Sequence, residues 1–441
     1  MDDEFVLVPE APEACDEHES SARDGLLHDI DCFVQELSSS LWPLNCFLHA
    51  NPETAYREHK AHDALTNFMK EREGWQVTCS AYSMETAWVA EFDSGQPGPA
   101  VSFNAEMDAL PQLGHACGHN LIAMASVAAG LAAAEMLRRG QLAGKIKIMG
   151  TPAEEGGGGG KIRCLEAGAY RDVDLCLISH PGILHNSPLV RTSAFTRLNA
   201  SYHGRAAHAA NSPWLGINAL DALIIAYNAI SVLRQQTRPD DVIGLQITDG
   251  GNKPNVIHEH AAGVAVLRAA SAARLAHLQQ QVEACFQAGA TATGARLVMD
   301  VEPGYMDHLP NRLLAARYRQ HWQELPNPPR PPLPPPDQPT CIKASTDQGN
   351  LSYALPSINV SFAIPPGAGA GQPHSPDFEK AAGTRGAFDR AMRVATAMAA
   401  TAIDVYVTPG LLAQVQAQWR RDVGVHHTRG VWSWGRVVSK R

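Results

Sequence analysis

The sequence of 441 residues lacks several features that mark particular classes of protein. No block of lysine and arginine stands out, and the net charge is −9 with a pI near 6.1. Such a chain is a poor partner for nucleic acid or for an anionic membrane surface, so we expect neither. The longest run of low polarity, residues 121–134, is shorter than the roughly 20 residues that a helix needs to cross a bilayer.

The first residues, Met-Asp-Asp-Glu-Phe, are acidic and show no basic segment followed by an apolar one, so we expect no secretory signal. Nine cysteines are scattered along the chain, and this odd number does not suit a disulfide framework. We therefore expect reduced thiols and place the protein in the cytoplasm.

The length and composition that are present predict two domains, because the chain is longer than a single hydrophobic core usually supports. Hydrophobic residues make up 45% of the sequence, enough to fill large cores. Residues 1–23 are acidic and aperiodic, which predicts a disordered lead. We expect a catalytic metal-binding domain in two parts (24–189 and 304–423), an inserted lid or dimerisation domain (190–303) and a tail (424–441).

Short apolar runs alternate with helical patterns outside the insert. A hairpin is predicted at residues 77–79 and 87–92, and buried strands at 100–104, 145–149, 173–178 and 357–364. Helices are predicted at 161–167, at 383–406 and at 120–139, where Asn120 is the expected N-cap. This alternation is typical of an α/β fold with an open, mostly parallel sheet and helices on both faces.

The insert follows a different order, β-α-β-β-α-β, which predicts a split βαβ (ferredoxin-like) domain. Its strands are predicted at residues 197–202, 242–248, 263–268 and 296–301, and its helices at 216–235 and 272–291. Beyond it, residues 325–339 contain nine prolines and predict a stiff surface loop or linker. An SH3-domain ligand is the alternative interpretation of this loop, although such runs are usually linkers.

Two short motifs carry residues suited to metal chemistry. Residues 115–120 read His-Ala-Cys-Gly-His-Asn, and residues 151–156 read Thr-Pro-Ala-Glu-Glu-Gly. Cys117 and His119 can supply sulfur and nitrogen ligands, and one of the two glutamates an oxygen. The other carboxylate is then free to act as a general base on metal-bound water. The combination favours a metal-dependent hydrolase.

Each motif also has a purely structural interpretation. Cys117 could be a small buried apolar residue and His119 a hydrogen-bonded core histidine. Glu154 and Glu155 could lie on a solvated loop, although two adjacent carboxylates at a buried strand end are costly without a cation. The five glycines that follow do not form a phosphate-binding loop, because Ile162 stands where that motif needs serine or threonine.

Other candidates follow predicted strands or lie in rigid loops. Asp108, His180 and the glutamate pair each come just after a strand, and the carboxyl ends of parallel strands meet at one edge of a sheet, so these side chains should converge. His374 lies in the loop Gln-Pro-His-Ser-Pro-Asp-Phe. Taken alone, a single histidine such as His180 or His374 is more often structural than a ligand.

The order and spacing of these motifs together resemble the aminoacylase family of dinuclear metallopeptidases. The resemblance is strongest to the branch with the plant auxin-conjugate amidohydrolases and the β-alanyl-lysine dipeptidases, and it runs from about residue 41 to 423. It includes the two motifs above and further segments at residues 41–42, 49–53, 104–111, 204–208, 218–221, 253–256, 345–350 and 374–378.

The resemblance implies a role for each matching residue. It implies Glu154 as the general base and Asp108 as the carboxylate that orients a metal-binding imidazole. His208 of the insert matches a histidine that reaches the partner's site in family dimers and supports the oxyanion. The implied metal ligands are Cys117, His119, Glu155, His180 and His374.

The resemblance also implies that Asn255 and Arg268 hold the carboxylate of the substrate. Auxin-conjugate enzymes usually have Asp-Met-Asp where this chain has Glu106-Met-Asp, a departure that points toward the dipeptidases. Two divalent metal ions are implied. We expect zinc because of the thiolate, with manganese as the alternative.

We therefore expect a metal-dependent amidohydrolase or dipeptidase that hydrolyses the amide bond of an N-acyl or aminoacyl amino acid with a metal-activated water. Its expected partners are a small amide or dipeptide substrate and a second copy of the chain. One alternative is an amide hydrolase or deacylase that tailors a small natural product. The other is a non-catalytic metal-binding scaffold protein, which would have no need for the second carboxylate at Glu154.

Overall fold

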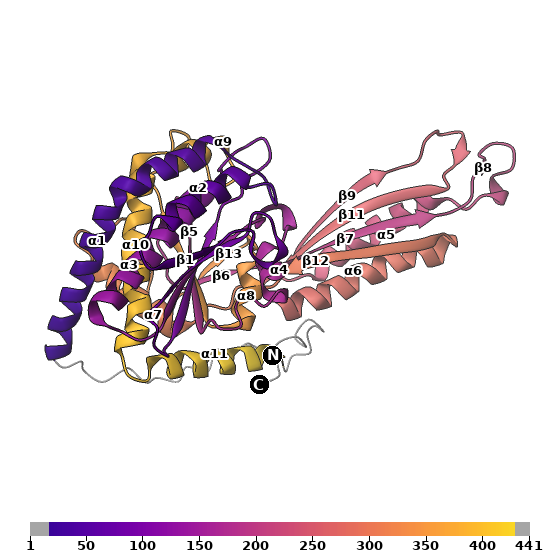
Figure 1. Cartoon of the computed structure of the whole chain (residues 1–441). Coiled ribbons are helices and arrows are strands. Elements are labelled where there is room, and N and C mark those ends of the chain that lie inside the picture. Colours follow the sequence, from indigo (N-terminus) through magenta and orange to yellow (C-terminus); the bar gives the residue numbers. More distant parts are fainter. Residues whose placement is uncertain (1–16, 428–441) are drawn as a thin grey trace.

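A computed structural model describes residues 17–427, and residues 1–16 and 428–441 lie outside the description (Figure 1). Most of the predicted disordered lead (1–23) and most of the predicted tail (424–441) therefore lie outside the described residues. Helix α1 (Glu17–Ala50) already includes residues 17–23, and helix α11 (Leu411–His427) includes residues 424–427.

A six-stranded sheet forms the centre of the catalytic part, and it confirms the predicted open, mostly parallel α/β fold. Strands β4, β3, β5 and β14 run parallel, and the antiparallel hairpin β1–β2 extends the sheet beside β4. Every residue of β3 and β14 is buried, as expected for parallel strands covered on both faces. In spatial order the strands are β1 (Trp75–Thr78), β2 (Trp88–Asp93), β4 (Lys145–Thr151), β3 (Ala100–Glu106), β5 (Leu175–Gly182) and β14 (Ser357–Ala363).

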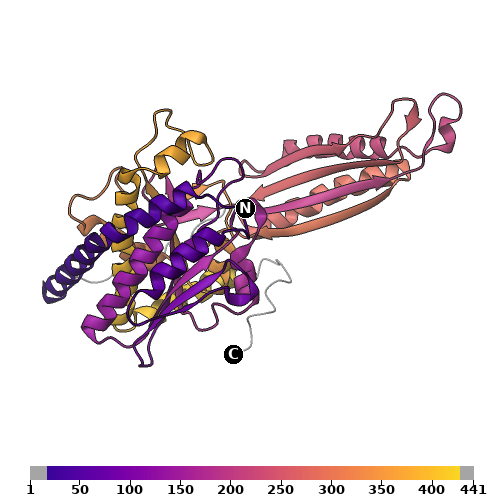
Figure 2. The ribbon, with the colours of Figure 1, turned by 45° about the horizontal axis from the view of Figure 1, so that its top comes forward.

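Helices cover both faces of this sheet (Figures 1 and 2). The larger core lies between the sheet and helices α1, α2 (His59–Lys70), α3 (His119–Gly140), α7 (Arg312–Glu324) and α10 (Arg385–Val407). A smaller core on the other face involves α4 (Gly160–Glu166) and α8 (Gln348–Ala354). Helix α9 (Pro376–Ala382) and the parallel pair β6 (Val190–Thr192) and β13 (Thr340–Ile342) complete this part.

Helix α3 is the central helix of the larger core. It is long and apolar enough to cross a membrane, but 94% of its apolar window is buried inside the protein, as in a core helix. Its N-cap is Gly118 in the left-handed conformation, with φ of 77°. The prediction that Asn120 caps the helix is therefore wrong. The side-chain amide of Asn120 instead donates to Oδ1 of Asn45 and to the carbonyl of Ala382, at 3.0 Å each.

The insert has its own antiparallel sheet and its own core, and its order of elements is the predicted split βαβ. Its strands, in spatial order, are β12 (Arg296–Tyr305), β7 (Ala194–His203), β11 (His260–Ala269) and β9 (Val242–Asp249). Helices α5 (Ala219–Leu233) and α6 (Ala272–Thr293) pack on this sheet. A small ribbon of β8 (Ala207–His208) and β10 (Val256–Ile257) lies at the end farthest from the catalytic part (Figure 1).

The proline-rich loop is attached to the catalytic part by side-chain hydrogen bonds to its carbonyls. Asn186 Nδ2 donates to the carbonyl of Pro329 at 3.1 Å and also to that of Pro331. Arg319 donates to the carbonyl of Pro334. Such contacts suit the predicted stiff surface loop, whereas its interpretation as an SH3-domain ligand stays a prediction.

Candidate metal centre

The five predicted metal ligands converge at the carboxyl ends of the parallel strands. His119 begins α3, Glu155 follows β4, and His180 lies in the last part of β5. Cys117 precedes α3 by two residues, and His374 comes from the loop before α9. The Sγ atom of Cys117 lies 3.3 Å from Nε2 of His180 and 3.3 Å from Nε2 of His374.

These side chains form two groups of three that share Cys117. One group is Cys117, His119 and His180, and the other is Cys117, Glu155 and His374. Within each group the ligand atoms all lie within 4.8 Å of one another. Each group offers a set of ligands for one divalent cation, and Cys117 would contribute to both.

Buried atoms without partners support this assignment. Nε2 of His119 and Oε1 of Glu155 are buried and have no hydrogen-bond partner among the described residues. Buried polar atoms in folded proteins nearly always have a partner. Nε2 of His119 and Oε1 of Glu155 lie 3.8 Å apart, and Nε2 of His374 lies 3.3 Å from the same oxygen, a spacing that suits a cation held among them. The residues present thus fit a pair of divalent metals.

Asp108 holds two of the predicted ligands, His119 and Glu155, in position. Its Oδ1 accepts a hydrogen bond from Nδ1 of His119 at 3.0 Å, which leaves the lone pair of Nε2 directed at the metal centre. Its Oδ2 accepts the backbone N–H of Glu155 at 2.9 Å. One carboxylate therefore fixes both the ring of His119 and the chain at Glu155.

The turn that carries Glu154 and Glu155 has a strained backbone. Ala153 has a positive φ of 55°, and its N–H donates to Oε1 of the buried Glu58 at 2.9 Å. Tyr305 donates its hydroxyl hydrogen to the carbonyl of Glu154 at 2.7 Å. The glycine run supplies further left-handed residues at 156, 157 and 159, which explains its composition.

The two adjacent glutamates have opposite pKa shifts. Burial, reinforced by the carboxylates of Glu106 and Glu155, raises the pKa of Glu154 well above its usual range. Burial acts in the same direction on Glu155, but the contact of its Oε1 with Nε2 of His374 at 3.3 Å and the nearby His119 lower its pKa overall. Glu155 therefore stays ionised, as a ligand must, while Glu154 is a carboxyl group that readily holds a proton.

The thiol and the two imidazoles of the first group also have shifted pKa values. Burial and the charge of Glu155 raise the pKa of Cys117 well above its usual range, so a bound cation is needed to deprotonate it. Burial lowers the pKa of His180, which keeps the neutral, ligating form. Against the effect of burial, Asp108 raises the pKa of His119.

A cavity of about 530 Å³ opens beside Cys117, His180 and His374. Its lining includes Lys343 and His185, and no acidic residue occurs among the described residues that line it. Its size suits a small-molecule substrate. It continues toward β13, where Thr340–Ile342 form part of the wall.

The structure brings one of the two predicted carboxylate-binding residues to this cavity. Arg268, in β11 of the insert, donates from Nη1 to Oγ of Ser345, a lining residue, at 2.7 Å. Its guanidinium carbon lies 5.0 Å from the ring centroid of Phe195. Arg268 therefore lies beside the wall of the cavity.

His208 and Asn255 are not brought to the metal centre of their own chain. Both lie in the ribbon at the far end of the insert (Figure 1), where Ala209 N–H donates to the carbonyl of Asn255 at 3.1 Å. Nδ1 of His208 accepts the backbone N–H groups of Ala210 and Asn211 at 3.3 and 3.1 Å. In the neutral ring the proton is then on Nε2, which leaves Nε2–H as a donor.

Two buried residues beside the centre, Lys161 and Asp347, were not predicted as site residues from the sequence. Nζ of Lys161 lies 2.5 Å from Oε1 of Glu106 and 2.5 Å from Oδ1 of Asp347. The sequence offered only weak signals. Lys161 follows the glycine run that suggested a phosphate loop, and Asp347 lies in one of the segments of the resemblance.

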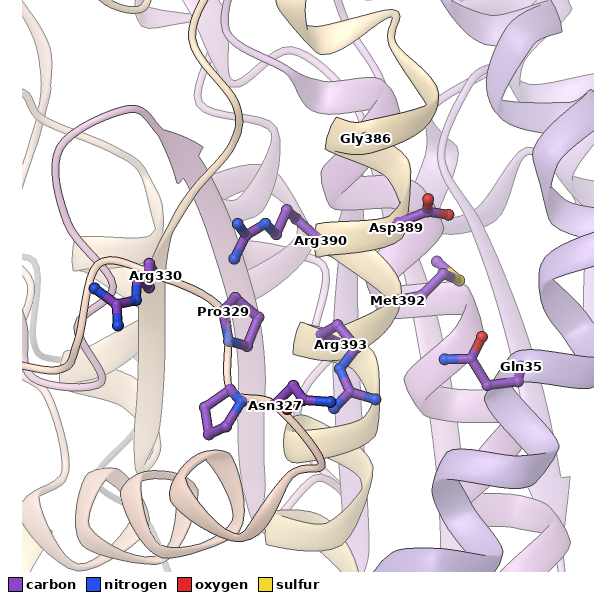
Figure 3. A pocket seen from close by; sticks show the side chains of 10 residues that line it. Gln35, Asn327, Pro329, Arg330, Gly386, Asp389, Arg390, Met392 and Arg393 are labelled. Carbon is purple, nitrogen blue, oxygen red and sulfur yellow. The ribbon is translucent and has the colours of Figure 1, made fainter.

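A second cavity, of about 490 Å³, lies between the proline-rich loop and α10 (Figure 3). Arg330, Arg390 and Arg393 line it, and Figure 3 shows them around the loop and the helix. Its described lining residues include no cysteine and no histidine. The metal-ligating residue types therefore gather at the first cavity and not at this one.

Comparison with known proteins also indicates a hydrolase. Residues 102–399 match the family model of Peptidase family M20/M25/M40. The Xaa-Arg dipeptidase of Mus musculus is 37% identical over 398 residues, which cover 88% of this chain and 90% of that protein. One of the subunits of the p-aminobenzoyl-glutamate hydrolase of Escherichia coli (strain K12) is 30% identical over 282 residues, 60% of this chain and 58% of that protein.

A solved structure agrees with the fold. A dinuclear metal-binding peptidase of Bacillus subtilis, from the M20 family, aligns with a TM-score of 0.64 at 17% identity, over 84% of this chain and 99% of that chain. The family model covers more than half of the sequence, and the mouse relative aligns over most of it. The chain thus belongs to Peptidase family M20/M25/M40 and is a metal-dependent hydrolase of peptide and amide bonds.

Proposed function

We propose that the protein is a dipeptidase that cleaves the bond between an aminoacyl group and a C-terminal amino acid. The observation that carries this proposal is the pair of ligand groups that share Cys117, with the free carboxyl group of Glu154 beside them. The Xaa-Arg dipeptidase relative makes dipeptides with C-terminal arginine the first substrates to test.

Glu154 is the proposed general base. When bound, two divalent cations would activate a water molecule and polarise the scissile carbonyl. Oε2 of Glu154 lies 4.0 Å from Nε2 of His119, at the edge of the ligand set. From there its carboxylate takes a proton from the attacking water and returns it to the leaving amine, a transfer that its raised pKa assists.

The proposed ligands are Cys117, His119, Glu155, His180 and His374. A thiolate, imidazoles and a carboxylate form a set that zinc accepts readily, so zinc is the proposed metal and manganese the alternative. Arg268 is the proposed partner of the substrate carboxylate at the rim of the cavity. Asn255 would join it only from the insert of another subunit.

A homodimer with a composite site explains the position of His208. Its ring presents Nε2–H from the end of the insert, so it can support an oxyanion in a partner subunit. Strand β9 forms an edge of the insert sheet and exposes Val242 and Ile247. Helix α5 exposes Ile224 and Tyr227, and together these apolar side chains suit a subunit interface.

The state of the cysteines supports a cytoplasmic location, which we also propose. All eight cysteines that the structure describes are free thiols, and three of them, Cys117, Cys164 and Cys176, are buried. Thiols persist in reducing compartments. Fractionation of cells that produce the protein would test this, and recovery from an oxidising compartment would contradict it.

The composition of the cavity favours a second candidate substrate. Lys343 and His185 line it without an acidic residue among the described lining, which suits an acidic or neutral side chain better than a guanidinium. The p-aminobenzoyl-glutamate hydrolase relative makes p-aminobenzoyl-glutamate the compound to test. Dimer closure could add acidic groups from a partner and restore the preference for arginine.

Hydrolysis assays decide between these substrates. The purified full-length chain, with its metal content measured, would be assayed on Xaa-Arg dipeptides, Xaa-Glu dipeptides, p-aminobenzoyl-glutamate and N-acyl amino acids. We expect kcat/KM to be highest for a dipeptide, activity to vanish with a chelator and activity to return when zinc or manganese is added. A protein that holds two metal ions and cleaves none of these compounds would overturn the proposal.

A further inference from the structure

A row of buried polar side chains runs along β3 to the metal centre. Side chains alternate between the faces of a strand, so Ser102, Asn104 and Glu106 share one face. All three are fully buried. Asn104 is held by Gln348 and by the hydroxyl of Tyr170, at 2.9 and 3.0 Å. The row ends at Glu106, the last residue of the strand.

The two carboxylate oxygens of Glu106 have different surroundings. Oε1 accepts a hydrogen bond from Nζ of Lys161 at 2.5 Å. Oε2 is buried, has no hydrogen-bond partner among the described residues and lies 3.5 Å from Nε2 of His119. The contact with Lys161 therefore fixes the carboxylate with its second oxygen directed at the ligand His119.

In the neutral form of His119, which is the form that binds a metal, Nε2 of His119 and Oε2 of Glu106 are both acceptors. Nδ1–H of His119 donates a hydrogen bond to Oδ1 of Asp108, so Nε2 of the neutral ring carries a lone pair. Two lone pairs that face each other repel unless a cation lies between them. Two ligands of one tetrahedral zinc ion, each at about 2.0–2.1 Å from it, are about 3.4 Å apart, close to the separation observed.

The buried charges lead to the same conclusion. Lys161 is one cation between two carboxylates, Glu106 and Asp347, and all three side chains are at most 2% exposed. Asp347 is held beside Lys161, because the backbone N–H of Lys161 also donates to Oδ2 of Asp347 at 2.8 Å. One buried negative charge is left over, and such a charge is costly without a further cation.

We infer that Glu106 is a further ligand of the cation held by His119, with Lys161 and Asp347 as positioning residues for its carboxylate. This inference rests on the metal centre of the proposed function. The ligand atoms of Glu106, His119 and Glu154 lie within 4.8 Å of one another, a third group distinct from the two that share Cys117. Glu106 thus lies on the side of His119 that faces the general base.

The test measures metal affinity, independently of catalysis. Full-length wild type and Glu106→Gln would be stripped of metal, and the affinity and stoichiometry of zinc would be measured by competition with a chromophoric chelator. We expect one of the two ions to bind about 10- to 100-fold more weakly in the variant, while the other is unchanged. The absorption spectrum of the cobalt-substituted variant should also change, because one ligand of the ion is altered.

Asp404→Asn is the matched control. Asp404 is as buried as Glu106, and its Oδ2 contacts Nε2 of His321 at 2.9 Å, in the core between α7 and α10. This variant removes a buried charge next to an imidazole without touching the metal centre. Both zinc affinities should stay at the wild-type values.

The outcomes separate this inference from the proposed function. If the wild type binds no metal, the proposed function fails. If the wild type and Glu106→Gln both bind two ions with equal affinity, only the role of Glu106 is overturned. If Glu106→Gln does not fold, Glu106→Asp replaces it, because that variant keeps the charge but withdraws the oxygen, and unchanged affinity there would likewise overturn the inference.

Discussion

At the scale of single residues, neighbours in the sequence have different chemical surroundings. Glu154 and Glu155 are adjacent, yet Asp108 fixes the backbone of Glu155 and His374 contacts its carboxylate, while the carboxyl group of Glu154 lies at the edge of the ligand set. The strained φ at Ala153 directs the two side chains into these separate positions.

We predict that Glu154→Gln abolishes turnover while the metal content stays near that of the wild type. The substitution removes the base but no proposed ligand, so kcat should fall by about 100- to 10,000-fold or more. Steady-state kinetics and elemental analysis on the same preparation would check this. Loss of one metal ion together with the activity would make Glu154 a ligand and contradict the assignment.

At this scale, the sequence predicted that the site residues lie close together, but it did not identify all of these residues. Asp108, Glu155 and His180 could be placed because each comes at or after the end of a predicted strand, and the carboxyl ends of parallel strands meet. Lys161 and Asp347 were missed because burial decides their role. They contact each other across 186 positions of sequence, and neither residue type indicates a site by itself.

At the scale of elements, one histidine connects β6 to the segment before α7. The N–H of His308 donates to Oγ1 of Thr192 at 3.2 Å, and its Nδ1 donates to the carbonyl of Val190 at 2.8 Å. His308 is fully buried, and burial lowers its pKa to about 4.

This shift predicts that His308 makes stability depend on pH. His308 binds a proton at about pH 6.5 in the unfolded state and only near pH 4 in the folded state. The contribution of the neutral ring to the free energy of unfolding is therefore complete above pH 6.5 and is lost as the pH falls toward 4. We expect a loss of about 2 kcal/mol in the free energy of unfolding between pH 7 and pH 5. Urea denaturation at both pH values, for wild type and His308→Gln, would measure it.

The variant serves as the control, since glutamine keeps a donor but does not titrate. Its free energy of unfolding should fall less than that of the wild type between the two pH values. Equal losses in both proteins would show that His308 titrates normally in the folded state.

Sequence patterns predicted the elements where periodicity alone determines them. The buried strands β3, β4, β5 and β14 and the long helices α3, α6 and α10 were predicted within a few residues of their ends. Asn120 was mistaken for an N-cap because tertiary contacts, invisible in the sequence, use its amide. The short helices α8 and α9, seven residues each, contain too little sequence for a helical period to show.

At the scale of the whole molecule, length and composition predicted two domains, whereas the placement of the insert could not be predicted from them. The pattern of strands and helices gives a split βαβ but does not say in which direction it projects. Figures 1 and 2 show it extending away from the catalytic part, with His208 in the ribbon at its far end.

We predict that mixing His208→Ala with Glu154→Gln restores activity that neither variant has alone. In a mixed dimer, the subunit with intact Glu154 would receive the intact His208 of its partner. Random exchange makes half of the dimers mixed, each with one working site, so about a quarter of wild-type activity should return.

Assays before and after subunit exchange would check this, with exchange followed by tagged subunits. Mixing each variant with itself is the control and should restore nothing. If exchange is complete and activity does not return, His208 does not act across an interface.

The insert is attached to the catalytic part at one end, so a small rotation at that end moves the opposite end by a larger distance. It joins the catalytic part through β7 and β12, which are neighbours in one sheet, and β7 alone has 10 residues. At roughly 3.3 Å per residue such a strand is about 33 Å long, so a rotation of about 10° at its base moves its end by about 6 Å. The stiffness of that base, far from the ribbon, therefore sets how accurately the far end can be positioned.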